Sequence, residues 1–289
     1  MTKPRILLVA TGGTIASAED GNGLTPQLTG EQLAGYVPQA AELADIDIVQ
    51  PMNIDSTNMR PADWQAIGDA ILAQYEDYDG FVVLHGTDTM AYTAAALSYL
   101  IQDSPRPIVL TGSQQPMGSP FTDARINLYQ SVLYATDPDS HDVAVVFGGK
   151  VVAGTRARKQ RTMSFNAFTS VNYPELALIR NDRIIRTAPA GSGDARAASE
   201  SRVYHDLDER VFVLKLTPEI NPSVFELLRR DYDAIILETF GIGGIPDTLH
   251  DAIFGWVDSG RTLVVTTQVP EEGLDLGVYE VGRAYAEHP

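Results

Sequence analysis

The sequence predicts an α/β protein: a larger N-terminal domain with a mostly parallel sheet flanked by helices, and a smaller C-terminal α/β domain with a parallel sheet of its own. Short apolar runs alternate with helical patterns along most of the chain, and one stretch rich in Ala, Gly and Ser interrupts them. The third observation is the length of the chain: 289 residues favour two domains over one.

The N-terminal part of the chain carries four apolar, β-rich runs that are suited to buried parallel strands. Helical patterns separate these runs, and the first of them opens with a proline and spaces Trp64, Ile67 and Ile71 along one face. The predicted strands are 5–10, 81–85, 107–112 and 143–149, and the predicted helices are 61–78, 89–102 and 123–136.

The interruption, TAPAGSGDARAASESR, has no periodicity and predicts an interdomain linker. We therefore divide the chain into an N-terminal domain over 1–186, a linker over 187–208 and a C-terminal domain over 209–289. The alternation resumes in the last part, with predicted strands 211–216, 234–241 and 262–268 and predicted helices 222–231 and 248–260.

The C-terminal domain has few helices for its sheet. The chain stops at AYAEHP, within what reads as a helical pattern, so only two helical segments remain to cover the predicted strands. Parallel sheets are normally covered on both faces. We therefore expect a further natural C-terminal segment or burial in an oligomer, and otherwise a sheet with one face partly bare.

Composition narrows the functional classes. The net charge of 21 − 38 = −17 repels phosphate backbones and anionic membranes, so neither nucleic acid nor a membrane is an expected partner. The absence of cysteine excludes disulfides, thiolate zinc sites and a cysteine nucleophile. The five histidines show no metal-ligand spacing. The first residues lack the features of a signal peptide, and we expect a cytoplasmic protein.

The first candidate site lies in ILLVATGGTIAS, residues 6–17. Gly12 and Gly13 let the backbone turn sharply after the predicted strand, and Thr14 then stands at the strand's C-terminal end. Ligands of open α/β sheets bind in the crevice beyond that end. A phosphate-cradling turn is the alternative, but neither GxGxxG nor GxxxxGK[ST] is present.

The second candidate site lies in VVLHGTDTM, residues 82–90, where Thr87 and Asp88 follow another apolar strand. Asp88 alone could be a helix N-cap, and His85 reads as a structural residue beneath the turn. Taken together, the two motifs place a hydroxyl beside a glycine at two strand ends. An α/β fold assembles a site from separate loops in this way.

These segments, ATGGTI and LHGTDTM, resemble the two signatures of the bacterial-type L-asparaginases, a family that includes glutaminase-asparaginases. The resemblance covers almost the whole chain, and GIGGIP and AYTAAALSYL are more similar to the cytoplasmic type I branch than to the periplasmic branch. Further matching segments are MNIDSTNM (52–59), IVLTGSQQP (108–116), GTRARKQRTMSFNAFTSVNYP (154–174) and ILETFGIGGIP (236–246).

The resemblance implies a role for each matched residue. Thr14 matches the primary nucleophile, Thr87 the second catalytic threonine, and Lys159 the lysine that completes a Thr–Lys–Asp triad with Asp88. The implied substrate-binding residues are Gly13, Ser56, Thr57, Thr87, Asp88 and Ser113. Without the resemblance, the basic run RARKQR around Lys159 would read as a solvated face or an ion-pair patch.

The implied activity is hydrolysis of L-asparagine to L-aspartate and ammonia through a threonine acyl-enzyme, without a cofactor or a metal. Weak hydrolysis of L-glutamine stays open, because the preference between the two amides depends on one methylene group and hence on the shape of the pocket. The resemblance also implies a homodimer or a homotetramer. Two other hypotheses stay open at this point: an asparaginase-like subunit of an amidotransferase, and a catalytically weak amino-acid-binding homologue.

One position departs from the family. The matching stretch of the lid, GNGLTP (21–26), has Leu24 where the family usually places a tyrosine that activates the nucleophile. A leucine side chain cannot donate or accept a proton. We therefore expect another hydroxyl to serve, or the enzyme to work differently.

Overall fold

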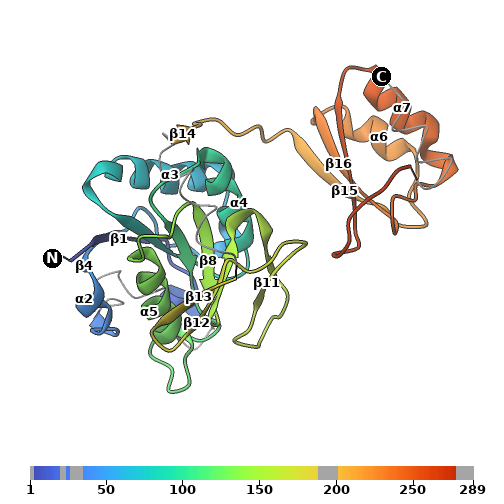
Figure 1. Ribbon diagram of the computed structural model, residues 1–289. Helices are drawn as coiled ribbons and strands as arrows, with labels where there is room; N and C mark the ends of the chain where they lie inside the picture. Colours follow the sequence, from blue (N-terminus) through green and yellow to red (C-terminus); the bar gives the residue numbers. More distant parts are fainter. Residues whose placement is uncertain (1–2, 20–23, 27–34, 188–200, 278–289) are drawn as a thin grey trace. The chain divides into compact units, whose positions relative to one another are not determined.

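The computed structural model describes residues 3–19, 24–26, 35–187 and 201–277, and the chain divides into two compact units, 1–206 and 207–289 (Figure 1). Most of the predicted linker and the final residues 278–289 lie outside the described residues. Within the predicted linker, β14 (Arg202–Val203) pairs antiparallel with β6 (Ile101–Gln102), so this part of it belongs to the first unit.

The first unit is built on an eight-stranded sheet of order β13-β12-β9-β8-β7-β5-β1-β4. Strands β8, β7, β5, β1 and β4 are parallel, whereas β9, β12 and β13 extend the sheet in antiparallel fashion. The predicted parallel strands are confirmed as β1, β5, β7 and β8. The bounds are β1 (Arg5–Ala10), β4 (Asp45–Val49), β5 (Gly80–Leu84), β7 (Ile108–Thr111), β8 (Val143–Phe147), β9 (Lys150–Ala153), β12 (Ala177–Arg180) and β13 (Arg183–Arg186).

Helices cover both faces of this sheet (Figure 1). Helices α3 (Pro61–Leu72) and α4 (Met90–Leu100) lie on one face, and α2 (Ala40–Leu43) and α5 (Ala124–Ala135) lie on the other. The helix predicted over 61–78 ends earlier, at Leu72, and a 3-10 turn over Tyr75–Asp77 follows.

Side chains on both faces of β1 are buried. Ile6 and Leu8 pack in one cluster with Leu128 and Val132 of α5, and all four are buried. Burial of each such side chain contributes about 1.5–3 kcal/mol. The rigid sheet that results fixes the loops at its strand ends.

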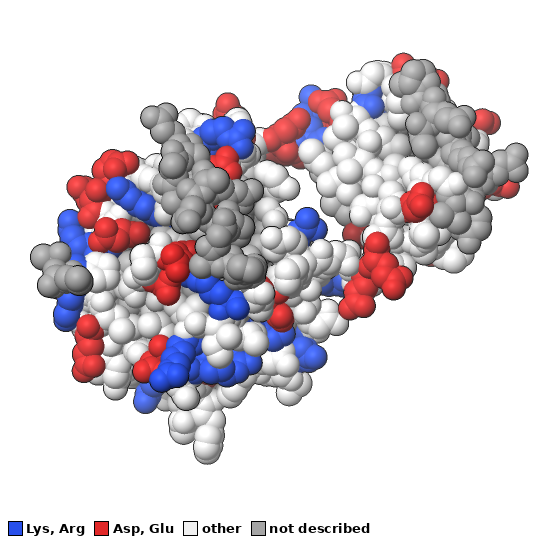
Figure 2. Space-filling view, in the orientation of Figure 1, with Lys and Arg blue, Asp and Glu red and all other residues white. Residues whose placement is uncertain are grey.

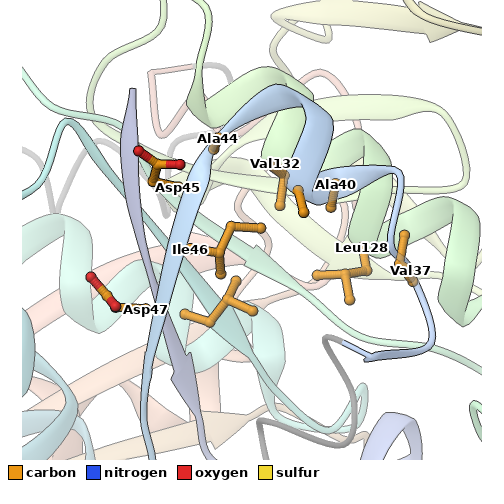
Figure 3. Close-up of a pocket in the computed structure, with 10 residues that line it drawn as sticks. Val37, Ala40, Ala44, Asp45, Ile46, Asp47, Leu128 and Val132 are labelled. Atoms are coloured by element: carbon orange, nitrogen blue, oxygen red, sulfur yellow. The ribbon is translucent and has the colours of Figure 1, made fainter. Parts of the chain in front are cut away.

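A cavity of about 380 Å³ lies beside the edge strand β4, between α2 and α5 (Figure 3). Ile46 points into it together with Val37, Leu128 and Val132, whereas Asp45 and Asp47 point away on the other side of the strand. None of the site residues predicted from the sequence lines this cavity.

Two small hairpins accompany the main sheet. Strand β10 (Ala157–Lys159) pairs antiparallel with β11 (Phe168–Ser170). Strand β2 (Ser17–Glu19) pairs antiparallel with β3 (Leu24–Pro26), so Leu24 is paired with Glu19.

The described part of the second unit has three strands in the order β15-β16-β17, and they are parallel, as predicted. Its two helices, α6 and α7, pack Phe225, Ile253 and Trp256 into a core with Leu214 and Leu237. The bounds are β15 (Val211–Lys215), α6 (Ser223–Leu228), β16 (Ala234–Thr239), α7 (His250–Asp258) and β17 (Thr262–Thr267).

One face of this smaller sheet carries exposed apolar side chains. Val213, Ile236 and Val264 are neighbours across the three strands, and Val213 and Val264 are 55% and 48% exposed. The neighbouring residues Leu214 and Ile235 point to the other face and are buried. Within the described part of the unit, the sheet therefore exposes apolar side chains on one face.

Candidate active site

The carboxyl ends of β1 and β5 lie side by side in the parallel part of the large sheet. The backbone N–H and the hydroxyl of Thr11 both donate to the carbonyl of Leu84, at 3.0 and 2.8 Å. The loop around Ile54 continues the pairing, because Ile54 N donates to Thr11 O at 2.9 Å and Gly13 N donates to Ile54 O at 3.1 Å. Three segments far apart in the sequence thus meet at one edge.

Glycines make this meeting possible. Gly12 and Gly13 have φ of 106° and 81°, in the region that disfavours other residues. A Cβ at Gly13 would lie 2.3 Å from Cα of Gly86, and a Cβ at Gly86 would lie 2.4 Å from Oγ of Ser56. The ATGGTI and HGTDT motifs are therefore in contact, with Ser56 against them. Thr14 follows at once, half-buried, at the start of a 3-10 turn over Thr14–Ala16.

Thr87, Asp88 and Lys159 form one hydrogen-bonded unit. Lys159 Nζ donates to Thr87 Oγ1 at 2.8 Å and to Asp88 Oδ1 at 2.6 Å. The Lys159 side chain is 18% exposed, whereas that of Asp88 is 58% exposed. These bonds bring Lys159, which the resemblance matched to the triad, into contact with Thr87 and Asp88.

The residues predicted to bind substrate differ in their surroundings. Ser56 is buried, and its carbonyl accepts a hydrogen bond of 2.7 Å from the Thr89 hydroxyl. Thr57 is exposed, and both its N–H and its hydroxyl donate to the Asp55 carboxylate, at 2.9 and 3.0 Å. These bonds hold the loop that presents Ser56 to Gly86.

Ser113 is fully buried after β7, and its hydroxyl donates to the carbonyl of Gln115. That hydroxyl is therefore used within its own turn. The preceding Gly112 lies against His85, where a Cβ would be 2.2 Å from the His85 carbonyl oxygen. The β7 loop is thus packed onto the HGTDT turn and reaches the same edge of the sheet.

His85 is a structural residue, as the sequence indicated. It is fully buried, its Nδ1 donates to the carbonyl of Gly86 at 2.7 Å, and Thr93 Oγ1 donates to its Nε2 at 2.8 Å. Burial lowers the pKa of His85 to about 4. The imidazole is therefore neutral at neutral pH, and both of its nitrogens support the turn that carries Thr87.

Sequence reasoning missed a buried polar network behind the site. The Asp123 carboxylate accepts from the backbone N–H of Gln114 and Gln115 and from Asn127 Nδ2. Asn127 also donates to Gly112 O at 3.0 Å and accepts from Gly148 N at 3.0 Å. The polar residues of SQQP and DARIN were the available signal, but only the fold brings them together.

Charge is mixed on the surface of the first unit. In the face shown by Figure 2, Lys and Arg side chains lie among Asp and Glu side chains. Among the described residues, none of the helices combines the length and the apolar composition needed to span a membrane. A small, polar ligand suits the strand-end site better than an apolar one, since hydroxyl, ammonium and carboxylate groups line it.

Comparison with known proteins agrees with this geometry. Residues 5–190 match the family "Asparaginase, N-terminal", and residues 210–289 match "Glutaminase/Asparaginase C-terminal domain". An L-asparaginase of Thermococcus kodakarensis is 38% identical over 98% of this chain and 86% of its own length. L-asparaginase 1 of Escherichia coli K12 is 35% identical over 99% of this chain and 86% of its own length.

Two solved structures and one further relative extend the comparison. The thermostable L-asparaginase from Thermococcus kodakarensis superposes with a TM-score of 0.88 and 36% identity, covering 98% of this chain and 86% of that one. A probable cytoplasmic L-asparaginase from Campylobacter jejuni gives a TM-score of 0.78 at 26% identity over 92% and 84% of the chains. A glutamyl-tRNA(Gln) amidotransferase component of Thermococcus kodakarensis is 34% identical over 97% of this chain and 66% of its own length.

The fold and the two threonine segments thus define a two-unit amidohydrolase. The chain belongs to the asparaginase family.

Proposed function

We propose that this protein hydrolyses the side-chain amide of L-asparagine, giving L-aspartate and ammonia. The observation that carries the proposal is the hydrogen-bonded unit of Thr87, Lys159 and Asp88 at the strand edge where Gly13 packs on Gly86. Thr14 stands next to that contact, at the start of its own turn. The family provides the reaction class, and the residues provide the groups that it needs.

In the first half of the proposed reaction, Thr14 Oγ attacks the amide carbon. The Thr14 proton passes to the departing nitrogen, the C–N bond breaks, ammonia leaves, and an aspartyl ester remains on Thr14. A threonine hydroxyl is a weak nucleophile until a base takes its proton. We assign the oxyanion to backbone N–H groups at the glycine turns around Gly13 and Thr87, where each donor is worth about 10²–10³ in rate.

In the second half, water cleaves the ester. The water oxygen attacks the ester carbon, the C–O bond to Thr14 breaks, and a proton returns to Thr14 Oγ. Thr87 and Lys159 are placed to take the water's proton along their hydrogen bond of 2.8 Å. Asp88, which accepts from Lys159 at 2.6 Å and is largely exposed, is free on its solvent side to bind the substrate's α-ammonium.

We assign the remaining substrate contacts to residues at the same edge of the sheet. We assign the α-carboxylate to Ser56, which lies against Gly86, with Thr57 holding its loop. Gly13 and Ser113 contribute backbone groups. We further propose a homodimer or a homotetramer and a cytoplasmic location, by similarity to the L-asparaginases above.

Ammonia release from L-asparagine by the purified protein tests the proposal. We expect turnover with L-asparagine, slower turnover with L-glutamine, and a fall of more than about tenfold for Thr14→Ala, because loss of the nucleophile removes the covalent route. Rapid-quench mass spectrometry should find the aspartyl ester on Thr14. Activity above a tenth of wild type in Thr14→Ala would remove Thr14 from this role.

The same assay addresses the other two hypotheses. The similarity to an amidotransferase component is the reason for the first of these hypotheses. Under it the chain works with a partner, and alone it would release little ammonia from free asparagine. A binding homologue would bind L-aspartate without turnover. Ammonia release by the isolated chain contradicts both.

A further inference from the structure

The backbone of Gln114 is held in place by hydrogen bonds that do not involve its side chain. Its backbone N–H donates to both oxygens of the buried Asp123 carboxylate, at 3.1 and 3.0 Å, and the N–H of Gln115 donates to the same carboxylate at 3.1 Å. Asn127 anchors Asp123 in turn, at 3.1 Å. The first turn after β7 is therefore fixed before the Gln114 amide makes any contact.

The hydrogen bonds determine how that amide is oriented. One end faces two backbone carbonyls, those of Arg161 at 3.5 Å and Ser164 at 3.3 Å, and only the NH₂ group can donate to them. The other end must then be the carbonyl oxygen, which lies 3.3 Å from Thr87 Oγ1. A carbonyl oxygen carries no proton, so the Thr87 hydroxyl is the donor.

This orientation fixes the direction of the hydrogen bonds that join Gln114, Thr87 and Lys159. The Thr87 hydrogen points to Gln114, so the oxygen's lone pair is left to accept from Lys159 Nζ at 2.8 Å. Lys159 also donates to Asp88. Lys159 therefore donates to Thr87, and Thr87 donates to Gln114.

The same amide ties down the hairpin that carries Lys159. Arg161 and Ser164 lie in the turn between β10, which ends at Lys159, and β11. Gln114 is thus bonded both to the threonine at the end of β5 and to the turn beside the lysine. One side chain connects two elements that must keep their spacing for Lys159 to reach Thr87.

We propose that Gln114 is a positioning residue of the amidohydrolase reaction, whose side-chain amide accepts from the Thr87 hydroxyl and fixes the turn after β10. This rests on the roles proposed above for Thr87 and Lys159. By holding both the threonine and the turn beside the lysine, Gln114 keeps Thr87 Oγ1 at 2.8 Å from Lys159 Nζ.

Few other charges face Lys159 in the described structure. Helix α4, which packs against β10, carries no charged residue, and neither does β11. Asp88 is the ion-pair partner. On the hairpin itself, Arg158 is exposed on the opposite face of β10, and Arg161 is bonded to Asn166 at 2.8 and 3.0 Å. A change at Gln114 should thus be visible in kcat.

The test measures kcat, KM and the melting temperature of full-length Gln114→Met and Gln114→Glu, with Gln115→Met as the matched control. For Gln114→Met we expect kcat to fall about tenfold with KM within about twofold, as for a lost hydrogen bond in the site. Gln114→Glu should keep a higher kcat than Gln114→Met, because a carboxylate oxygen can still accept from the Thr87 hydroxyl. Gln115→Met should keep the wild-type kcat.

The partial rescue by Gln114→Glu distinguishes this role from a structural one, in which the loss of kcat would follow the loss of melting temperature in both variants. Wild-type kcat in Gln114→Met, or equal kcat in the two variants, would overturn the inference. If Lys159→Met keeps wild-type activity, the proposed function itself fails. If Lys159→Met is inactive and Gln114→Met resembles the wild type, only the role of Gln114 fails.

Discussion

Gly13 and Gly86 lie in contact, backbone against backbone, so that a Cβ on Gly13 would be 2.3 Å from both Cα and N of Gly86. This contact joins the strand end that carries Thr14 to the turn that carries Thr87 and Asp88. Neither glycine can give way, because each neighbour is main chain or a buried side chain.

Alanine at either glycine should therefore disrupt the site. For Gly13→Ala and Gly86→Ala we expect a loss of about 1–3 kcal/mol in the free energy of unfolding, from overpacking at both positions and from strain at the positive φ of Gly13. Activity should fall about 10²-fold or more, since reacting groups tolerate little displacement. The measurements are urea denaturation and ammonia release.

Gly118→Ala is the matched control, because no atom lies within 4 Å of a Cβ built there. Its stability should stay within about 0.5 kcal/mol of wild type. Equal effects at Gly118 and Gly13 would mean that the close contact is not the cause.

Thr87 and Lys159 should behave as one unit. We expect Thr87→Val and Lys159→Met each to lower kcat about 10²-fold or more, and the double variant to be scarcely worse, because residues that act together are non-additive. Arg158→Met serves as the control, since Arg158 is the exposed neighbour in the same basic run. Multiplicative losses in the double variant would separate Lys159 from the chemistry of Thr87.

His85 should make the first unit sensitive to acid. Its pKa is lowered to about 4 by burial, whereas that of an unfolded histidine is 6.5. Between these values the unfolded chain binds a proton that the folded chain does not, so stability is lost as pH falls from 6.5 towards 4. The loss attributable to His85 should be about 2 kcal/mol between pH 7 and pH 5.

Urea denaturation at the two pH values measures this effect, with Trp64 fluorescence reporting on the first unit in a Trp256→Phe background. His85→Gln should be less stable at pH 7, because it loses the bonds to Gly86 and Thr93. Its stability should nevertheless depend less on pH than that of wild type. An equal pH dependence in both proteins would mean that other groups cause it.

The sequence was sufficient for the buried elements. Runs such as RILLVA have apolar side chains on both faces, and they form the central parallel strands. Strand β4 was missed because DIDIV alternates acidic and apolar residues, and it lies at the sheet edge with Asp45 and Asp47 pointing outward. The antiparallel strands β9, β12 and β13 are short and partly exposed, so their apolar signal was weak.

The site was predictable in its residue types but not in its contacts. The motifs located Thr14, Thr87 and Asp88 at strand ends, and the resemblance added Lys159 from a segment with no catalytic signal of its own. No local pattern indicates that Gly86 packs on Ser56, or that Gln114 reaches Thr87. Such contacts depend on which strands are neighbours, and that order appears only in the folded sheet.

Leu24 provides the last prediction, because it stands where the family has a tyrosine. The backbone at Leu24 is held by pairing with Glu19 in the hairpin that directly follows the 3-10 turn of Thr14, and β3 lies against that turn. A tyrosine hydroxyl there could take part in proton transfer, whereas leucine cannot. We expect Leu24→Tyr to raise kcat for L-asparagine by up to about 10²-fold.

Leu24→Phe is the control, because it adds the ring without the hydroxyl and should give no comparable gain. Equal gains in both variants would assign the effect to packing of the lid. No gain in Leu24→Tyr would mean that another hydroxyl already serves. Thr25 is the nearest in sequence, since it adjoins Leu24 in β3. In that case Thr25→Val should lower kcat in the wild-type background and have less effect when Leu24 is replaced by tyrosine, because the two hydroxyls would then serve the same step.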